Sequence, residues 1–398
     1  MGMVSKKRKQ LEESQEEAKK LKGEEEAVEE EGLSPEKFRQ QSKIVAVPRE
    51  GVDSELPSPV QSFEAAPFAR RLREVLAEAF PAPSPIQAQA WPICVAGRDL
   101  VAVAKTGSGK TLAFLLPAFK IIARWSKSWE QAPGQAPVLV LAPTRELATQ
   151  IHAECRRFAP AKLRCSAVFG GTAKAPQAKE LKQAPQVLVA TPGRLQDFMG
   201  TNEVDLSQVQ LLVLDEADRM LDMGFEPEIA KILSQAPDER QTLLFTATWP
   251  KAVRRIAEKY LKPDYLHVNV GDTEELAANK AVSQEFFRLG DDEKDDKLWQ
   301  ILSGLSDDAK VICFANTKRR IDGFQKTFWA KGFESVALHG DKLQKDRDRD
   351  LEKFAKGETW LLFATDVCSR GLDIKGVTHV VNLDMAGIRA DGDVFLLI

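Results

Sequence analysis

The sequence predicts two doubly wound α/β domains in tandem, preceded by a charged tail. From about Phe63, short apolar runs alternate with stretches of helical period, stop at "KPDYLHVNVGDTEELAANKAVSQ" and then resume. At 398 residues, the chain is long enough for two domains of ordinary size and a tail. We expect the tail at residues 1–45, the first domain at 60–262, a linker at 263–283 and the second domain at 284–398.

The apolar runs are expected to be parallel strands. They are apolar almost throughout, as is typical of strands that helices cover on both faces. They lie at residues 99–104, 137–143, 186–191, 211–218 and 242–248 in the first domain and at 311–316, 335–340, 360–366 and 379–384 in the second. Stretches such as 145–159, 297–305 and 318–332 have the period and length of helices. Two such domains on a linker predict a ligand in the cleft between them.

The tail has a different composition from the rest of the chain. The stretch "KKRKQLEESQEEAKKLKGEEEAVEEE" is nearly all charge. It buries too little apolar surface to offset the entropy of ordering, so we expect it to be disordered or at most a solvated helix. Within it, "KKRK" at Lys6–Lys9 is either a nuclear import signal or a plain solvated charge run.

The overall composition narrows the class of protein. Hydrophobic residues make up 43%, which is ordinary for a soluble protein with a substantial core. The net charge of −3 means that any nucleic-acid binding needs a local basic groove. The five cysteines are scattered without a C-x-x-C pair, so we expect reduced thiols in an intracellular protein and no structural zinc. No apolar run suits a membrane span or a secretory signal.

A phosphate-binding loop is the sharpest chemical signal. The segment "AKTGSGKT", Ala104, Lys105, Thr106, Gly107, Ser108, Gly109, Lys110 and Thr111, follows one predicted strand and precedes a helix. Its glycines let backbone amides face a phosphate, Lys110 can reach the β/γ oxygens, and Thr111 can ligate Mg²⁺. The general pattern has Gly where Ala104 stands, and a Gly-rich turn without a ligand is the alternative.

A second acidic site follows a later strand of the same domain. In "LLVLDEAD", Asp215 leaves the apolar run and Glu216 comes next. We expect Asp215 to hold the metal and Glu216 to polarise the attacking water of a nucleoside triphosphatase. An acidic strand end by itself often only begins a turn, but together with the phosphate loop it predicts this chemistry.

These motifs occur in a recognisable order. "AKTGSGKT", "PTREL", "TPGR", "DEAD", "TAT", "HGD" and "ATDVCSRGLDI" together resemble the DEAD-box RNA helicases of superfamily 2, over about residues 63–384. The resemblance implies two tandem RecA-like domains, ATP and Mg²⁺ as cofactors, and single-stranded or short duplex RNA as partner. It also implies catalytic roles for Lys110, Asp215, Glu216, Thr246 and Thr248, with Asp215 on the ion through water. Thr246 and Thr248 belong to the motif that links hydrolysis to duplex separation.

The resemblance extends to the base and to the RNA. It implies Gln87 at the adenine edge, Phe63 stacked on adenine or simply in the core, and Gly371 and Asp373 near the nucleotide. The residues it places on the RNA backbone are Thr144, Arg145, Gly170, Gly171, Thr191, Gly193 and Arg194, then Thr317, Gln344, Arg347, Thr365 and Asp366. Residues 204–221, 245–257 and 275–284 look closest to the nucleolar branch of the family. This resemblance implies a role in rRNA processing in the nucleolus, with pre-rRNA and pre-ribosomal proteins as partners.

The C-terminal stretch departs from the family pattern. The family continues after "VVNLD" with H-R-x-G-R-x-x-R, whose arginines stabilise the γ-phosphate in the transition state. Residues 385–398 contain one arginine, Arg389, which does not stand in this pattern. We therefore expect a chain cut short, with an incomplete second domain and apolar surface that residues 393–398 do not cover. The alternative function is a short product that binds ATP and RNA, hydrolyses poorly and acts as a competitor or binding module.

Overall fold

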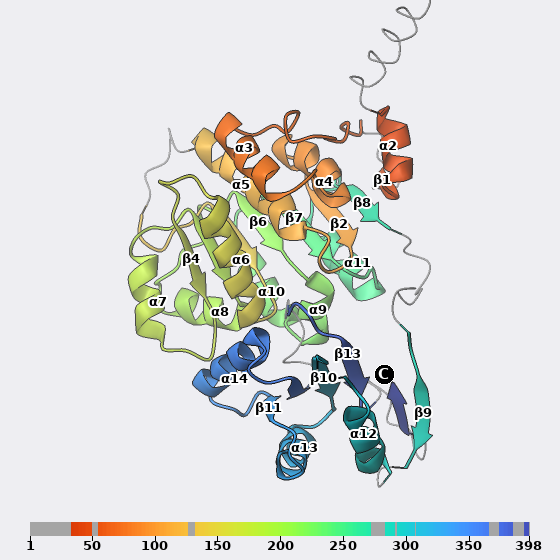
Figure 1. Ribbon diagram of the computed structural model, residues 1–398. Helices are drawn as coiled ribbons and strands as arrows, with labels where there is room; N and C mark the ends of the chain where they lie inside the picture. Colours follow the sequence, from red (N-terminus) through yellow and green to blue (C-terminus); the bar gives the residue numbers. More distant parts are fainter. Residues whose placement is uncertain are drawn as a thin grey trace, which may run out of the picture. The chain divides into compact units, whose positions relative to one another are not determined.

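A computed structural model describes residues 33–49, 55–125, 132–271, 283–290, 293–306, 308–365, 374–384 and 394–397 (Figure 1). They fall into two compact units, one built mainly from residues before 274 and one mainly from residues after it. Each unit has its own sheet, with eight strands in the first and six in the second among the described residues. No helix in this part of the chain has the length and apolarity to cross a bilayer.

The first unit is a doubly wound α/β sheet, as predicted. Its strands run in the spatial order β1-β8-β2-β7-β6-β3-β5-β4 and are parallel except for β1. They are β1 (Ile44–Pro48), β2 (Leu100–Ala104), β3 (Val138–Leu141), β4 (Cys165–Val168), β5 (Val187–Ala190), β6 (Leu211–Leu214), β7 (Gln241–Thr246) and β8 (Leu266–Val270). The helices are α2 (Pro35–Gln41), α3 (Arg70–Ala79), α4 (Pro85–Val95), α5 (Lys110–Trp125), α6 (Arg145–Phe158), α7 (Lys174–Leu181), α8 (Pro192–Gly200), α9 (Ala217–Asp222), α10 (Glu226–Leu233) and α11 (Lys251–Tyr260).

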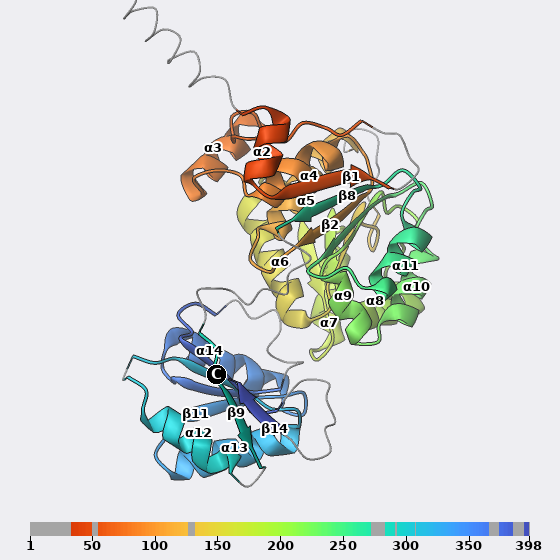
Figure 2. The ribbon, with the colours of Figure 1, turned by 90° about the vertical axis from the view of Figure 1, so that its right-hand side faces the viewer.

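Helices cover both faces of this sheet, which explains why its central strands are apolar throughout. On one face, Val103, Leu141 and Leu214 share a core cluster with Phe198 of α8 and Ile256 of α11. On the opposite side of the sheet lie α4, α5 and α6 (Figure 2), where α4 contacts β1, β2 and β8 and packs on α5. Each Å² of apolar surface that is buried contributes roughly 25 cal/mol to stability, and these strands bury such surface on both faces. This burial favours their position in the centre of the unit.

The second unit is smaller and is built on the same principle. Its sheet has the order β11-β12-β10-β13-β14-β9, with β9 (Phe286–Leu289), β10 (Val311–Phe314), β11 (Ser335–Leu338), β12 (Leu361–Ala364), β13 (His379–Asn382) and β14 (Val394–Leu397). The first four in this order are parallel. Its helices are α12 (Lys294–Ser303), α13 (Lys318–Ala330) and α14 (Gln344–Lys356).

The prediction of a tail up to residue 45 is wrong for its last part. Residues 1–32, with Lys6–Lys9, lie outside the described residues. From there, Ser34 caps α2 by accepting a hydrogen bond from the Lys37 backbone N–H, and Pro35 begins the helix. Strand β1 then pairs antiparallel with β8. The chain therefore enters the fold well before Phe63.

The predicted linker also begins too early. Residues 266–270 of the expected linker form β8, which lies between β1 and β2 in the first sheet. The segment "LHVNV" alternates between buried and partly exposed positions, so it lacks the continuous apolar character of the other strands. Residues 272–282 of the expected linker lie outside the described part of the chain.

The expectation that residues 393–398 leave the second sheet uncovered is wrong for the four described residues among them. Residues 394–397 form β14, which pairs antiparallel with β9 and meets β13 at Asn382. Two unpaired strand edges offer hydrogen-bonding groups to any apolar, β-forming segment, and "VFLL" has that character. Phe286 and Val380 of the flanking strands are nevertheless 60% and 40% exposed. Arg389 lies outside the described residues.

Asp99 ties three segments of the first unit together at the start of β2. Its side chain is buried, Oδ1 accepts a hydrogen bond from the Thr242 backbone N–H at 2.8 Å, and Oδ2 accepts one from the Lys262 backbone N–H at 2.8 Å. Burial raises the pKa of Asp99, and the two hydrogen bonds oppose that shift. Strand β7 and the turn before β8 are thus fixed against β2 by one carboxylate.

We expect Asp99→Ala to lower the free energy of unfolding by about 2–4 kcal/mol, because two buried N–H groups lose their acceptor. Since the pKa of Asp99 is raised, the folded chain holds this proton more tightly than the unfolded chain. The difference in the free energy of unfolding between the wild type and Asp99→Ala should therefore shrink as the pH rises from about 4. Denaturant unfolding at several pH values measures both effects. Asp264→Ala, at a half-exposed carboxylate 3.3 Å from the Arg98 guanidinium, is the control; an equal loss there would contradict the assignment.

Candidate functional site

The strand order of the first sheet brings the predicted motifs to one edge. In a parallel sheet, the carboxyl ends of all strands lie at the same edge. The phosphate loop follows β2, the "TAT" segment ends β7, and "DEAD" follows β6, and these three strands are direct neighbours. Residues more than 100 positions apart in the chain are therefore placed side by side. This is the topology that nucleotide sites of doubly wound sheets use.

The phosphate loop has the backbone that its glycines predict. Gly107 and Gly109 have φ angles of 76° and 89°, a region that L side chains rarely adopt. A Cβ on Gly109 would also lie 2.6 Å from Gln87 Nε2 and 2.9 Å from Ser84 Oγ. Ser108 Oγ is buried and has no hydrogen-bond partner in the part of the chain that the structure describes. Such an orphaned hydroxyl beside a loop of backbone amides suits an anionic ligand.

Lys110 is the first residue of α5 and is buried. Its Nζ donates hydrogen bonds to the Ala104 carbonyl at 2.7 Å and the Lys105 carbonyl at 3.0 Å. Burial lowers the pKa of Lys110, and the charges of Asp215 and Glu216 oppose that shift. The ammonium group is thus held inside the loop and faces the carboxylates after β6.

The two carboxylates after β6 differ in their surroundings. Asp215 is 3% exposed, and burial raises its pKa to about 7, against the charge of Lys110. Glu216 has a left-handed backbone, with φ 51° and ψ 54°, which costs a residue with a Cβ about 1–3 kcal/mol. Its Oε2 accepts a hydrogen bond from Arg219 Nη1 at 3.0 Å. The strained turn and Arg219 together fix the direction of the Glu216 carboxylate.

The "DEAD" and "TAT" segments are joined by direct hydrogen bonds. Asp218 Oδ2 accepts from the Thr248 backbone N–H at 2.9 Å and from Thr248 Oγ1 at 2.7 Å. Thr246 is fully buried, and its Oγ1 donates to the Thr248 carbonyl at 2.8 Å. A displacement of Asp218 would therefore also move Thr248, which follows β7.

The family resemblance implies that the "TAT" segment links ATP hydrolysis to duplex separation. On that expectation, Thr248→Val should reduce duplex separation by up to about tenfold while ATP turnover changes less, because it removes one of the two bonds to Asp218 at nearly constant shape. Strand-displacement and phosphate-release assays on the same preparation give the two rates. Thr201→Val, whose hydroxyl bonds to backbone and Glu203 at the end of α8, is the matched control. Parallel losses in both assays would contradict a coupling role.

Gln87 is placed beside the phosphate loop. Its Oε1 accepts a hydrogen bond from the Ser84 backbone N–H at 3.0 Å, and its Nε2 donates to the Gly109 carbonyl at 3.1 Å. An amide has two acceptor and two donor positions, so one of each is left for an adenine edge. Phe63 is 3% exposed, with its ring centroid 6.3 Å from that of Trp91. The structure thus favours the core alternative for Phe63.

A cavity of about 420 Å³ adjoins the phosphate loop. Its lining includes three residues of the loop, Lys105, Gly107 and Ser108. Residues 84–86 also line it, as do Lys43 before β1 and Val270 and Gly271 at the end of β8. Neither Gln87 nor Phe63 lines it. The Gly271 N–H donates to the Lys43 carbonyl at 2.9 Å, which closes this side. Residues of the predicted tail and linker therefore line the cavity beside the phosphate loop.

The RNA-binding candidates of the first unit lie at the same edge of the sheet. "PTREL" follows β3, "GG" follows β4 and "TPGR" follows β5, and these strands are neighbours at the end of the order. Thr144 Oγ1 accepts from the Leu147 N–H at 3.2 Å and Thr191 precedes α8, so both begin helices. Arg194 is mostly buried beside Asp197, with the Nε and Oδ2 atoms 3.6 Å apart. Gly170 and Gly193 have open space where a Cβ would stand.

The candidates of the second unit follow the same rule where they are described. Thr317 follows β10 and caps α13, Gln344 and Arg347 lie in the first turn of α14 after β11, and Thr365 follows β12. Strands β11, β12 and β10 are neighbours, so these positions share one edge. Asp366, Gly371 and Asp373 lie outside the described residues.

Comparison with known proteins agrees with this arrangement. The profile of the DEAD/DEAH box helicase family matches residues 84–256, and that of the helicase conserved C-terminal domain matches residues 293–392. The crystal structure of the RNA helicase Prp28 from Chaetomium thermophilum bound to ADP is 36% identical and has a TM-score of 0.53, covering 87% of this chain and 82% of that one. The chain belongs to the DEAD-box RNA helicase family. Its two sheets are thus the RecA-like domains of that family.

Two further relatives set the extent of the match. DEAD-box ATP-dependent RNA helicase 14 of Arabidopsis thaliana is 46% identical over 354 residues, which are 88% of this chain and 56% of that protein. ATP-dependent RNA helicase DBP2 of Chaetomium thermophilum is 44% identical over 356 residues, 88% of this chain and 62% of that protein. This DEAD-box chain therefore spans about half to three fifths of the length of these curated relatives.

Several residues of the site were not among the sequence-based candidates. Asp218 and Arg219 became candidates only through their bonds to Thr248 and Glu216. The last letter of "DEAD" is the signal that could have indicated Asp218. No local pattern indicates Arg219, because its partner is defined by the strained turn at Glu216.

Proposed function

We propose that this chain is an RNA-stimulated ATP hydrolase that separates short RNA duplexes. The observation that carries the proposal is the strand order β2-β7-β6-β3-β5-β4. It brings the phosphate loop, "TAT" and "DEAD" next to "PTREL", "TPGR" and "GG" at one edge of one sheet. Membership of the family, and relatives named ATP-dependent RNA helicases, support this activity.

In the proposed reaction, the loop amides and Lys110 hold the phosphates, and Gln87 with its remaining donor and acceptor positions orients the base. Thr111 and Asp215 are the residues that would hold Mg²⁺, Asp215 through a water, and the ion would neutralise charge on the phosphate oxygens. The buried Asp215, with its raised pKa, is more stable as an anion beside a cation. Glu216 orients and deprotonates the attacking water, while Asp218 passes any movement to Thr248.

RNA stimulation of ATP turnover tests the proposal. We expect Arg145→Ala combined with Arg194→Ala to weaken the binding of an oligouridine by about tenfold or more, since charge-assisted bonds to phosphate are each worth about 1.5–3 kcal/mol. Binding of a fluorescent ATP analogue should persist. Arg156→Ala, at an exposed position of α6, is the control. Unchanged RNA affinity in the double variant would contradict the groove, and binding of both ligands without turnover would favour the competitor alternative.

The cellular role that we propose is rRNA processing in ribosome biogenesis, with pre-rRNA and pre-ribosomal proteins as partners in the nucleolus. "KKRK" at Lys6–Lys9 and the resemblance of several segments to the nucleolar branch support it. RNA crosslinked to the tagged protein in cells should be enriched in pre-rRNA. Replacing Lys6–Lys9 by alanine should abolish nuclear accumulation. The yeast relative Prp28 is a DEAD-box splicing factor, so enrichment of spliceosomal RNA instead would overturn this role.

A further inference from the structure

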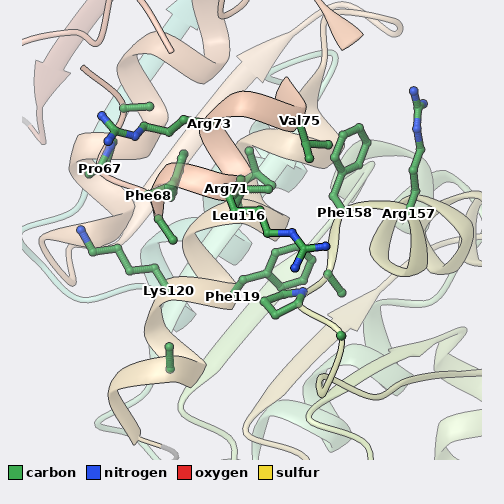
Figure 3. A pocket seen from close by; sticks show the side chains of 17 residues that line it. Pro67, Phe68, Arg71, Arg73, Val75, Leu116, Phe119, Lys120, Arg157 and Phe158 are labelled. Carbon is green, nitrogen blue, oxygen red and sulfur yellow. The ribbon is translucent and has the colours of Figure 1, made fainter. Parts of the chain in front are cut away.

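A second cavity, of about 820 Å³, lies on the first unit between α3, the middle of α5 and the residues that end and follow α6 (Figure 3). None of the nucleotide or RNA candidates lines it. Lys120, on its wall, is roughly 15 Å along the axis of α5 from Lys110. Its volume lies within the range of about 300–1,000 Å³ that ligand pockets have. We refer to it as the α3/α5 pocket.

The floor of the α3/α5 pocket is apolar. Leu116 and Phe119 of α5 form it, with Phe68 before α3 and Phe158 at the end of α6 beside them (Figure 3). Val75 of α3 is 37% exposed at the rim, so the apolar surface reaches solvent. An apolar hollow of this kind favours a ligand that buries large side chains in it.

The rim of the pocket is basic. Four of its lining residues, Arg71, Arg73, Lys120 and Arg157, carry positive charge, and none is acidic. Partial burial is the main cause that lowers the pKa of Lys120, and the positive charge of Arg124 adds to it. A neighbouring carboxylate would favour the charged form of this amine. The local charge contrasts with the net charge of −3 for the whole chain.

The aromatic rings of the pocket do not suit nucleic acid. Single-stranded RNA binds to basic grooves that offer open aromatic faces for stacking. The Arg157 guanidinium lies 4.8 Å from the Phe158 ring centroid, and Phe80 stacks on Phe158 at 6.2 Å. Phe68 meets Trp91 at 5.0 Å in a T-shaped arrangement. Phe119 is only 2% exposed. These rings are thus already in contact with other side chains or buried, so they offer little open face on which a base could stack.

We propose that the α3/α5 pocket docks an acidic segment of a partner protein. The segment places large apolar side chains against Leu72, Val75 and Pro160, apolar lining residues that reach solvent. Its Asp or Glu side chains face Arg71 and Lys120. This combination of an apolar floor and a complementary charged rim is the basis of helix-in-groove recognition. The site is separate from the phosphate loop, so binding of the segment does not require release of nucleotide.

The test is selection from a phage-displayed library of random peptides on the full chain, with depletion on the double variant Arg71→Glu/Lys120→Glu. We expect enriched peptides to combine Asp or Glu with large apolar residues. The most enriched one, synthesised and labelled, should bind the double variant at least about tenfold more weakly by fluorescence anisotropy. Val75→Asp should weaken it as well. Arg70→Glu, at the neighbouring position of α3 and ion-paired outward with Glu74 at 2.8 Å, should change the affinity by less than about twofold.

Four results would overturn the proposal. These are enrichment of peptides without acidic residues, no enrichment that depends on Arg71 and Lys120, displacement of the peptide by residues 11–32 of this chain, and binding of an oligouridine that the double variant weakens. The third would assign the pocket to the chain's own acidic stretch, and the fourth would assign it to RNA. Binding of a fluorescent ATP analogue by the double variant should equal that of the wild type, which separates this site from the nucleotide site.

Discussion

Glu216→Gln is expected to reduce RNA-stimulated ATP turnover by about 100- to 10,000-fold, the contribution that a positioned general base typically makes. Glutamine keeps the shape of the side chain and an oxygen for the Arg219 guanidinium, which lies 3.0 Å from Glu216 Oε2. It loses the negative charge that deprotonates water. The left-handed backbone at residue 216 is unchanged by the substitution. The variant should therefore bind ATP and RNA normally while hydrolysis fails.

Single-turnover hydrolysis with saturating ATP measures this effect apart from binding. The matched control is Glu226→Gln, the same chemical change at an exposed position in the first turn of α10. Arg219→Leu should give an intermediate loss, because Glu216 keeps its charge but loses the group that orients it. A turnover of Glu216→Gln within about tenfold of the wild type would contradict the role of Glu216 as the base.

The parts of the fold that the sequence predicted are those in which the pattern is local. Strands β2, β3, β5, β6 and β7 are covered on both faces, so each reads as a continuous apolar run. Strands β1 and β8 alternate between more and less buried positions and pair with each other at the side of the sheet. Their pattern resembles loop and linker composition unless the partner strand is known.

The start of α2 carried a signal that composition concealed. Ser34 followed by Pro35 is a typical helix start, but it adjoins a highly charged stretch whose composition predicts a tail. Strand β14 is a different case, since a short apolar run finds its place only when the open edges of β9 and β13 are known. Both corrections concern pairing or capping partners rather than propensity.

The site shows the same division. The motifs predict Lys110, Asp215 and Glu216 as site residues, because each follows a strand at a fixed spacing, and the structure places them close together. The contacts among motifs depend on strand order and could not be predicted from spacing, as the bonds from Asp218 to Thr248 show. Gln87 lies between these cases. "SPIQ" has the pattern of a capping box, which predicts its bond to the Ser84 N–H but not its bond to Gly109.

Lys110→Ala is expected to weaken ATP binding by roughly 10- to 150-fold, the equivalent of about 1.5–3 kcal/mol for a charge-assisted hydrogen bond. The substitution removes a positive charge from the phosphates and also two hydrogen bonds that hold the loop. Lys110 Nζ is the donor for the Ala104 and Lys105 carbonyls, and its charge opposes the burial that raises the pKa of Asp215 to about 7. Without it, Asp215, Glu216 and Asp218 lose the positive charge of Lys110, and Arg219 beside Glu216 remains.

Titration with a fluorescent ATP analogue measures the affinity, and thermal unfolding without nucleotide shows that the variant is folded. The control is Lys120→Ala on the same helix, where the side chain lies on the wall of the α3/α5 pocket and away from the phosphate loop. Its ATP affinity should match that of the wild type. If Lys110→Ala also bound the analogue within about twofold of the wild type, the phosphates would have to rest on the loop amides alone. Lys110 would then stabilise the loop, through its bonds to the Ala104 and Lys105 carbonyls, without contributing to ATP binding.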